Sequence, residues 1–247
     1  ATVAGSRQAI DELLRFLHGL PEIGEFPHQE SCFEVAPFER LKVKVKREIV
    51  TLGMPEVNPN HHQVGTYVAP EHWNQVISDP DVVLVDARND FEVELGTFEG
   101  AINPHTHRFR ELPDYVSSNL DPKTNKKVAM FCTGGIRCEK ATAYMLQQGF
   151  EQVYHLKGGI LNYLKTVPKS ESLWRGECFV FDERVTVDHN LEQGHYDLCL
   201  GCGHPVSEAD RQSPHYEAGI ACPHCYQELT AEKRARLEAR QQQRRLD

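Results

Sequence analysis

The sequence predicts an α/β protein whose central part is built around a parallel sheet. Short apolar runs of strand length alternate with stretches of helical periodicity between residues 65 and 170. The run at 82–86 is apolar up to its last residue, as expected of a strand buried on both faces. Two Cys-x2-Cys pairs follow later in the chain and indicate a small metal-stabilised module. We therefore expect an α/β domain at 65–170, with smaller parts at 1–53 and 176–247.

Composition narrows the class of protein. Of the 247 residues, 40% are hydrophobic and 26% are charged, which is typical of a globular protein, and no apolar run approaches the roughly 18 residues of a membrane span. The net charge of −9 argues against a general nucleic-acid coat, so any RNA contact must come from local basic patches. Cysteines arranged as metal pairs and one loop thiol favour a reducing, cytoplasmic setting. No nucleotide-cofactor motif is evident, and the oligomeric state is not predicted.

The first segment, 1–53, is predicted to be part of a small α/β domain. Ser6 is a suitable N-cap for a helix that Gly19 ends. Apolar and basic residues alternate over 40–53, which predicts a strand with one cationic face. That face fits either a solvated edge strand, in which lysines oppose aggregation, or a surface for an RNA backbone. The basic residues concerned are Arg40, Lys42, Lys44, Lys46 and Arg47.

The central domain follows a linker at 54–67 that is rich in Pro and Asn. Pro70 is placed to open a helix, and Pro113 is expected to break or restart another. The predicted strands are 82–86, 128–131 and 152–156, and the predicted helices are 70–78, 109–120, 137–149 and 158–167.

The strongest functional signal is the loop that follows the strand at 128–131. The strand ends at Cys132, two glycines follow, and a helix begins near Arg137. Backbone N–H groups in such a loop, backed by a helix N-terminus, form an anion site, and here the thiolate is the anion, with a pKa lowered to roughly 3.5–7.5. Arg137 adds a fixed positive charge. The competing interpretations are a small buried thiol and an ordinary turn. The loop residues whose amides would stabilise the thiolate are Thr133, Gly134, Gly135 and Ile136.

Four residues separate Cys132 from Arg137, and this small ring suits a persulfide better than a tetrahedral phosphate. At this point the sequence resembles the rhodanese family over about 65–170. The stretch 82–104 is similar to the front signature of that family, with Thr97 where many members have His, and 153–164 is similar to its closing strand and Gly-Gly helix start. The resemblance implies a rhodanese-like fold with Cys132 as the catalytic thiol.

A closer resemblance joins the loop CTGGIRCEKA, the run GECFVFDERV at 176–185 and the cysteine pairs beyond it. Together they resemble the rhodanese-like tRNA uridine hydroxylases. This resemblance implies tRNA as the partner, molecular oxygen as co-substrate, and conversion of the wobble uridine to 5-hydroxyuridine with Cys132 as the active-site residue. It also implies a ferredoxin-like N-terminal domain, which this chain would enter partway, so we expect an incomplete N-terminal sheet.

Two other functions remain open from the residues. The protein could be a sulfurtransferase that carries a persulfide on Cys132, or a non-catalytic RNA-binding scaffold with a vestigial loop. His105 and His107 raise the alternative of an iron site, although no carboxylate is placed to complete it. Cys138 could resolve a persulfide or merely face the core. The three charged residues of the front signature, Asp86, Arg88 and Glu92, are expected to bond to one another and to be mainly structural.

The final segment carries the metal prediction. Cys199 and Cys202 form one pair, Cys222 and Cys225 the other, and 19 residues lie between them. This spacing predicts a structural zinc site with four thiolates, while two redox disulfides would need a thioredoxin-like context. His204 or His224 could replace one sulfur. Residues 233–247 carry six positive and two negative charges, which fits a solvated helical tail or a helix along tRNA phosphates.

Overall fold

The computed structural model describes residues 2–26, 28, 30–32, 37–38 and 41–244. The chain divides into two compact units: residues 1–45 with 181–184, and residues 46–180 with 185–247. None of the helices in the described part of the chain has the length and apolar character that a membrane crossing requires.

The first unit contains one regular element, the helix α1 (Arg7–His18), among its described residues. The Ser6 hydroxyl accepts a hydrogen bond from the Ala9 N–H at 3.3 Å, so the predicted N-cap is present. Gly19 lies at the C-terminal end of this helix, as predicted.

The strand predicted over 40–53 is wrong for the residues that the structure describes, because 41–53 contain no strand. Leu41, Val43 and Val45, which should cover a core, are 82, 85 and 101% exposed. An alternating pattern forms a strand only when a neighbouring strand supplies hydrogen-bond partners, and the described residues of this unit provide none. Arg40 lies outside the described residues.

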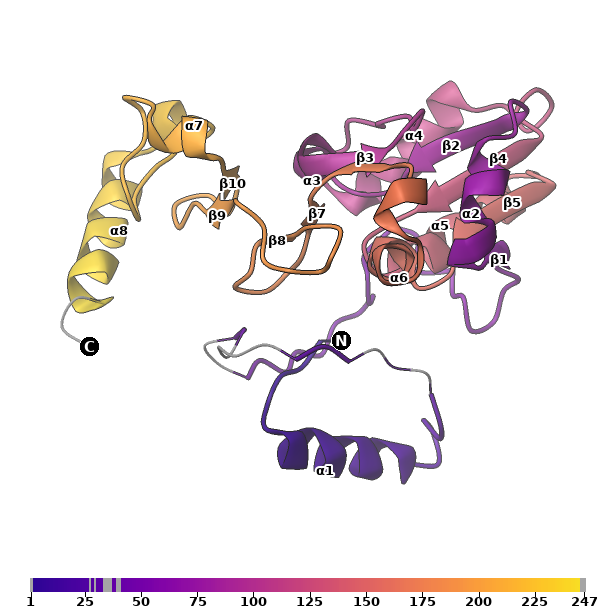
Figure 1. Ribbon diagram of the computed structural model, residues 1–247, viewed down its shortest axis with the longest axis horizontal. Coiled ribbons are helices and arrows are strands. Elements are labelled where there is room, and N and C mark those ends of the chain that lie inside the picture. The colour runs from indigo at the N-terminus through magenta and orange to yellow at the C-terminus, as the bar shows by residue number, and fades with distance from the viewer. Residues whose placement is uncertain (1, 27, 29, 33–36, 39–40, 245–247) are drawn as a thin grey trace. The chain divides into compact units, whose positions relative to one another are not determined.

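The second unit contains the predicted parallel sheet (Figure 1). Its four strands lie in the order β1 (Thr66–Val68), β5 (Gln152–Leu156), β4 (Lys127–Phe131) and β2 (Val82–Asp86), and every pairing is parallel. The C-terminal ends of β2 and β4 are in register, with Asp86 opposite Phe131. The residues that follow these two strands therefore emerge at the same edge of the sheet.

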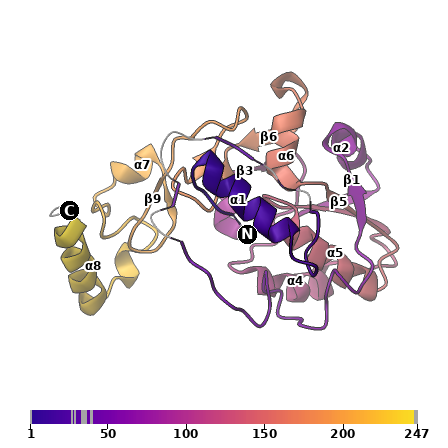
Figure 2. The same ribbon diagram turned by 90° about the horizontal axis from the view of Figure 1, so that it is seen from below.

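Helices cover both faces of the sheet, as Figure 2 shows. One face packs against α4 (Leu112–Asn119) and α5 (Ile136–Gln147), and the other against α2 (Pro70–Ile77) and α6 (Gly159–Thr166). Along β4, Val128 and Met130 belong to the first core and Ala129 and Phe131 to the second. All four side chains are fully buried. Burial on both faces explains why these residues of β4 are all apolar.

Shorter elements complete the fold. The predicted restart near Pro113 is confirmed, because the 3-10 turn η1 (Phe109–Glu111) precedes α4 and Pro113 lies in its first turn. The helix α3 (Asp90–Leu95) was not predicted. Its signal in the sequence is Asn-x-x-Glu, since the Glu92 carboxylate accepts a hydrogen bond from the N–H of Asn89 at 3.1 Å, as in one half of a capping box.

Antiparallel two-stranded pairs connect the remaining parts. The pairs are β3 (Gly96–Phe98) with β6 (Trp174–Gly176), β7 (Cys178–Phe179) with β8 (Thr186–Val187), and β9 (Asp197–Leu198) with β10 (Pro205–Val206). The other elements are η2 (Lys169–Glu171), α7 (Glu208–Arg211), η3 (Tyr226–Glu228) and α8 (Ala231–Arg244).

Candidate active site and metal centre

The Cys132 loop is held between the end of β4 and the starts of two helices. The Cys132 side chain is buried, and Gly135, with φ of +87°, makes the turn that begins α5. The carbonyl of Cys132 accepts a hydrogen bond from the Ile160 N–H at 3.0 Å. A Cβ added to Gly159 would lie 2.5 Å from the carbonyl oxygen of Cys132, so only glycine allows α6 to approach the loop so closely. The start of α6 therefore supports the loop.

The environment of Cys132 favours its thiolate. Burial raises the pKa of the thiol, but this effect is outweighed by a hydrogen bond from the Cys138 thiol, the positive charge of Arg137 and the backbone N–H groups of Cys138 and Arg137. Together they lower the pKa of Cys132 from 9.0 to about 6, which lies in the predicted range. The thiolate is therefore the main form at neutral pH.

The Cys138 thiol donates the hydrogen bond that the Cys132 thiolate accepts. Burial and its hydrogen bond to Cys132 raise the pKa of Cys138 well above 9.0, so it keeps its proton and donates it. Its backbone N–H, which donates to the Gly135 carbonyl at 3.1 Å, also contributes to the lowered pKa of Cys132. The sequence left open whether Cys138 resolves a persulfide or merely faces the core. The structure shows that its side chain is 0% exposed and belongs to the core, and a resolving role remains a prediction.

Arg137 is fixed by Glu92. Its two terminal nitrogens lie 2.7 and 2.8 Å from the two carboxylate oxygens, in a bidentate ion pair. The Thr133 hydroxyl lies within 3.3 Å of both side chains. Burial raises the pKa of the Glu92 carboxyl, but Arg137 outweighs this and the net pKa is lowered. Glu92 thus orients the cation that stabilises the Cys132 thiolate, a role beyond the structural one expected of it.

Asp86 and Arg88 bond to one another, as predicted. Arg88 is 0% exposed, and its Nε and Nη2 donate to the Asp86 carboxylate at 2.9 and 2.6 Å. Its remaining donors reach the backbone carbonyls of Glu92 and Gly96 at 3.1 and 2.6 Å. These bonds satisfy a fully buried guanidinium and tie the first turn and the C-terminal end of α3 to Asp86 at the end of β2. The ion pair therefore holds Glu92 in place.

The two histidines of the iron alternative do not converge on a metal site. His105 Nδ1 lies 2.9 Å from Asp90 Oδ1, whereas the His107 backbone N–H donates to Glu111 at 2.8 Å. Within the described residues, neither histidine belongs to a group of three or more side chains able to hold one ion. The iron alternative therefore lacks support there.

The four paired cysteines do converge. Their sulfur atoms all lie within 4.8 Å of one another, with 3.9 Å between Cys199 and Cys225 and 3.7 Å between Cys202 and Cys222. A tetrahedral zinc ion with Zn–S bonds of about 2.3 Å places its sulfurs roughly 3.8 Å apart, so this donor set fits a metal ion. The antiparallel strand pair β9–β10 and a small apolar core surround the cluster.

His204 and His224 do not replace any sulfur. Their rings stack on each other with centroids 3.7 Å apart, and among the described residues the ligand group consists of the four cysteines alone. Gly201 is required in the first knuckle, because an added Cβ would clash with the carbonyl oxygen of Ile220. Neither histidine is therefore needed as a ligand, because the four cysteines complete the site.

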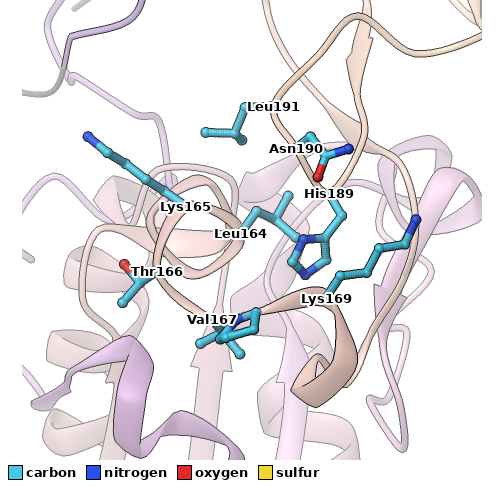
Figure 3. Close-up of a pocket in the computed structure, with 9 residues that line it drawn as sticks. Leu164, Lys165, Thr166, Val167, Lys169, His189, Asn190 and Leu191 are labelled. Atoms are coloured by element: carbon cyan, nitrogen blue, oxygen red, sulfur yellow. The ribbon is translucent and has the colours of Figure 1, made fainter.

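An open hollow of about 470 Å³ lies at the C-terminal end of α6, away from the Cys132 loop along that helix. Figure 3 shows His189 reaching into it beside Leu164 and Lys169. The Nε2 atom of His189 is buried and has no hydrogen-bond partner among the described residues. None of the loop residues 132–137 lines this hollow, so it is separate from the Cys132 thiol.

Two models of known protein families match parts of this chain. A family model for the rhodanese-like domain matches residues 69–166, which contain the sheet and the Cys132 loop. A second model, for the UPF0176 acylphosphatase-like domain, matches residues 1–49. The fold and the loop thus define a rhodanese-like protein with a distinct N-terminal region.

Two curated relatives match nearly the whole chain and carry the same name. A protein of Picosynechococcus sp. named tRNA uridine(34) hydroxylase is 61% identical over 244 residues, which are 99% of this chain and 82% of that protein. A protein of Teredinibacter turnerae with the same name is 58% identical over 245 residues, covering 99% of this chain and 76% of its own. The chain belongs to the tRNA uridine(34) hydroxylase family.

Similarity to solved structures is weaker. The rhodanese-like domain of an Anabaena sp. protein is 20% identical, covers 44% of this chain and 78% of its own, and has a TM-score of 0.37. This score is too low to add to the assignment.

Proposed function

We propose that this protein hydroxylates uridine 34 of tRNA and that Cys132 is its catalytic residue. The observation that supports Cys132 is a buried thiolate with a pKa of about 6, stabilised by Arg137 and the Cys138 thiol. Membership in a family whose curated members are named for this reaction supplies the substrate. Because the substrate is a tRNA, we expect the protein to work in the cytoplasm.

In the proposed reaction, the Cys132 thiolate adds to C6 of the uracil ring, next to the carbon that is modified. The C5=C6 double bond supplies the electron pair that makes C5 nucleophilic, and the new C5–O bond forms there with molecular oxygen as the oxidant. The second oxygen atom leaves as water, using two electrons and two protons from an external donor. Loss of the C5 proton and of the Cys132 sulfur then restores the double bond.

Arg137 and the loop amides have a defined part in this scheme. They stabilise the Cys132 thiolate before it adds to the ring and again when it is released from the ring. The sulfur therefore serves as both nucleophile and leaving group at neutral pH. The amides that contribute to the pKa include those of Arg137 and Cys138, which lie just beyond the predicted set of Thr133 to Ile136. We propose that the predicted amides line the remainder of the ring.

We further propose that the four-cysteine cluster holds a structural zinc ion. All four ligands are thiol sulfurs, the set has no open position, and soft thiolates favour zinc among the common divalent ions. A bound zinc ion would cross-link two turns that share only a small apolar core.

The basic segment near the N-terminus remains a proposed RNA contact. Lys42, Lys44, Lys46 and Arg47 are all exposed, as RNA phosphates would require. The proposed domain limits are 1–53, 65–170 and 176–247, and the last of these contains the cysteine cluster.

The test is nucleoside analysis of tRNA from cells that lack the protein and are complemented with different variants. We expect wild type to restore 5-hydroxyuridine, Cys132→Ser not to restore it, and Cys32→Ser to behave as wild type, because Cys32 is exposed. Full activity of Cys132→Ser would remove this thiol from the mechanism. Failure of wild type, combined with turnover of thiosulfate to thiocyanate, would identify a sulfurtransferase instead.

A further inference from the structure

The helix α8 is docked on the cysteine module, by which we mean residues 197–229 around the four-cysteine cluster. Leu237 is 6% exposed and packs in the same small core as the four cysteines. Arg234 forms an ion pair with Glu217 at 2.6 Å, and an atom added to Gly219 would clash with the side chain of Gln241. The helix is therefore held on one side, whereas a solvated tail would show no such contacts. Figure 1 shows α8 beside this module.

Docking leaves a stripe of positive charge on the helix. Lys233, Arg236 and Arg240 follow each other at spacings of three and four residues, so they fall within about 60° of the helix circumference. Arg236 and Arg240 are exposed, and Lys233 is half-buried. Within residues 2–244, as far as they are described, none of the three forms an ion pair, in contrast to Arg234.

The stripe contrasts with the rest of the chain. The protein has a net charge of −9, which repels polyanions in general. Three cations on one helix face that form no ion pair with any described residue therefore need a reason. The stripe is roughly 10 Å long, at about 1.5 Å of rise per residue. A strand of duplex DNA presents about one phosphate per 3.4 Å of its axis, and on this scale a nucleic-acid backbone of the same length offers about three phosphates.

We infer that the stripe formed by Lys233, Arg236 and Arg240 is a docking surface for the phosphate backbone of the tRNA substrate. This inference rests on the proposed function, which supplies a polyanionic substrate. The apolar contact of Leu237 and the Arg234–Glu217 ion pair fix the helix, so the three charges are presented in one geometry. Such contacts position a nucleic acid without reading its sequence.

The test measures how tRNA binding depends on salt. Wild-type full-length protein and a Lys233→Gln/Arg236→Gln/Arg240→Gln variant are titrated against a fluorescein-labelled tRNA transcript with an unmodified U34, from 50 to 300 mM NaCl. Each lost phosphate contact reduces the slope of log Kobs against log[salt] by about 0.7–0.9, so the triple variant should lose about 2–3 from the slope. Its affinity at 100 mM NaCl should fall at least about tenfold.

Two further variants serve as controls. Lys123→Gln/Lys126→Gln/Lys165→Gln removes the same charge from exposed positions of the rhodanese-like domain and should change the slope by less than about 1. Lys233→Arg/Arg236→Lys/Arg240→Lys keeps the charge and should retain the wild-type slope. Equal melting temperatures and metal contents would show that the variants are folded.

The inference is overturned if the stripe variant and the charge-matched control give the same slope. It is also overturned if the stripe variant binds tRNA normally but no longer binds vesicles that contain anionic phospholipid, since the stripe would then face a lipid surface. Nucleoside analysis separates this result from the proposed reaction. A wild type that restores no 5-hydroxyuridine but shows the expected change of slope would retain the docking surface and lose the hydroxylase.

Discussion

The hydrogen bond from Cys138 to Cys132 can be tested by removing its donor. The drop in the pKa of Cys132 from 9.0 to about 6 corresponds to about 4 kcal/mol in favour of the thiolate, after burial has acted in the opposite direction. A hydrogen bond to a charged group contributes about 1.5–3 kcal/mol, and a thiol is a weak donor, so its share is near the lower limit. We therefore expect Cys138→Ala to raise the pKa of Cys132 by about one pH unit.

The assay is the rate of alkylation of Cys132 by iodoacetamide as a function of pH, measured by mass spectrometry of the peptide that contains it. Cys138→Ser is the matched control, because its hydroxyl keeps a donor at the same place. Wild type and Cys138→Ser should titrate near pH 6, and Cys138→Ala near pH 7. The reasoning is refuted if Cys138→Ala titrates like wild type, or if Cys138→Ser moves the midpoint as far as Cys138→Ala does.

Four other predictions follow from the same contacts. The folded-state pKa of Cys132 is depressed, so its stabilising effect is present above the unfolded pKa of 9.0 and is lost as the pH falls through about 6. The excess unfolding free energy of wild type over Cys132→Ser should therefore grow by about 3 kcal/mol from pH 6 to 9, and a constant difference in urea titrations would contradict this. Glu92→Gln leaves the partly buried Arg137 without its carboxylate and should cost about 3–5 kcal/mol of unfolding free energy in the same assay, whereas a loss below about 1 kcal/mol would mean that the pair is replaceable. Gly159→Ala should cost at least about 2 kcal/mol and slow alkylation of Cys132, since φ is +67° there and the new Cβ would lie 2.5 Å from the carbonyl oxygens of Cys132 and Thr133. An unchanged melting temperature and rate would argue against support of the loop by α6. Metal analysis should give one zinc per chain, lost together with helical circular dichroism in Cys222→Ser, and a zinc-free but fully helical wild type would exclude the structural metal.

Local features of this protein were determined by contiguous residues. The Cys132 loop needs a strand end, a glycine that tolerates positive φ and a helix start, and all three are adjacent in the chain. The cysteine pairs likewise predict a cluster, because a two-residue spacing brings two sulfurs to one ion. Sequence patterns of this kind predict a site because the backbone alone places its parts.

Partners that are distant in the chain were decided by the tertiary structure. Glu92 meets Arg137 across 45 residues, and Gly159 meets Cys132 because two parallel strands end at one edge of the sheet. The same reason explains why the strand predicted over 40–53 is wrong at the described residues 41–53, where the sequence alternates but no described neighbouring strand completes the ladder. Alternation and charge spacing indicate which face a residue occupies, but only packing decides what that face meets. For α8, that packing left Lys233, Arg236 and Arg240 without an ion pair among the residues that the structure describes.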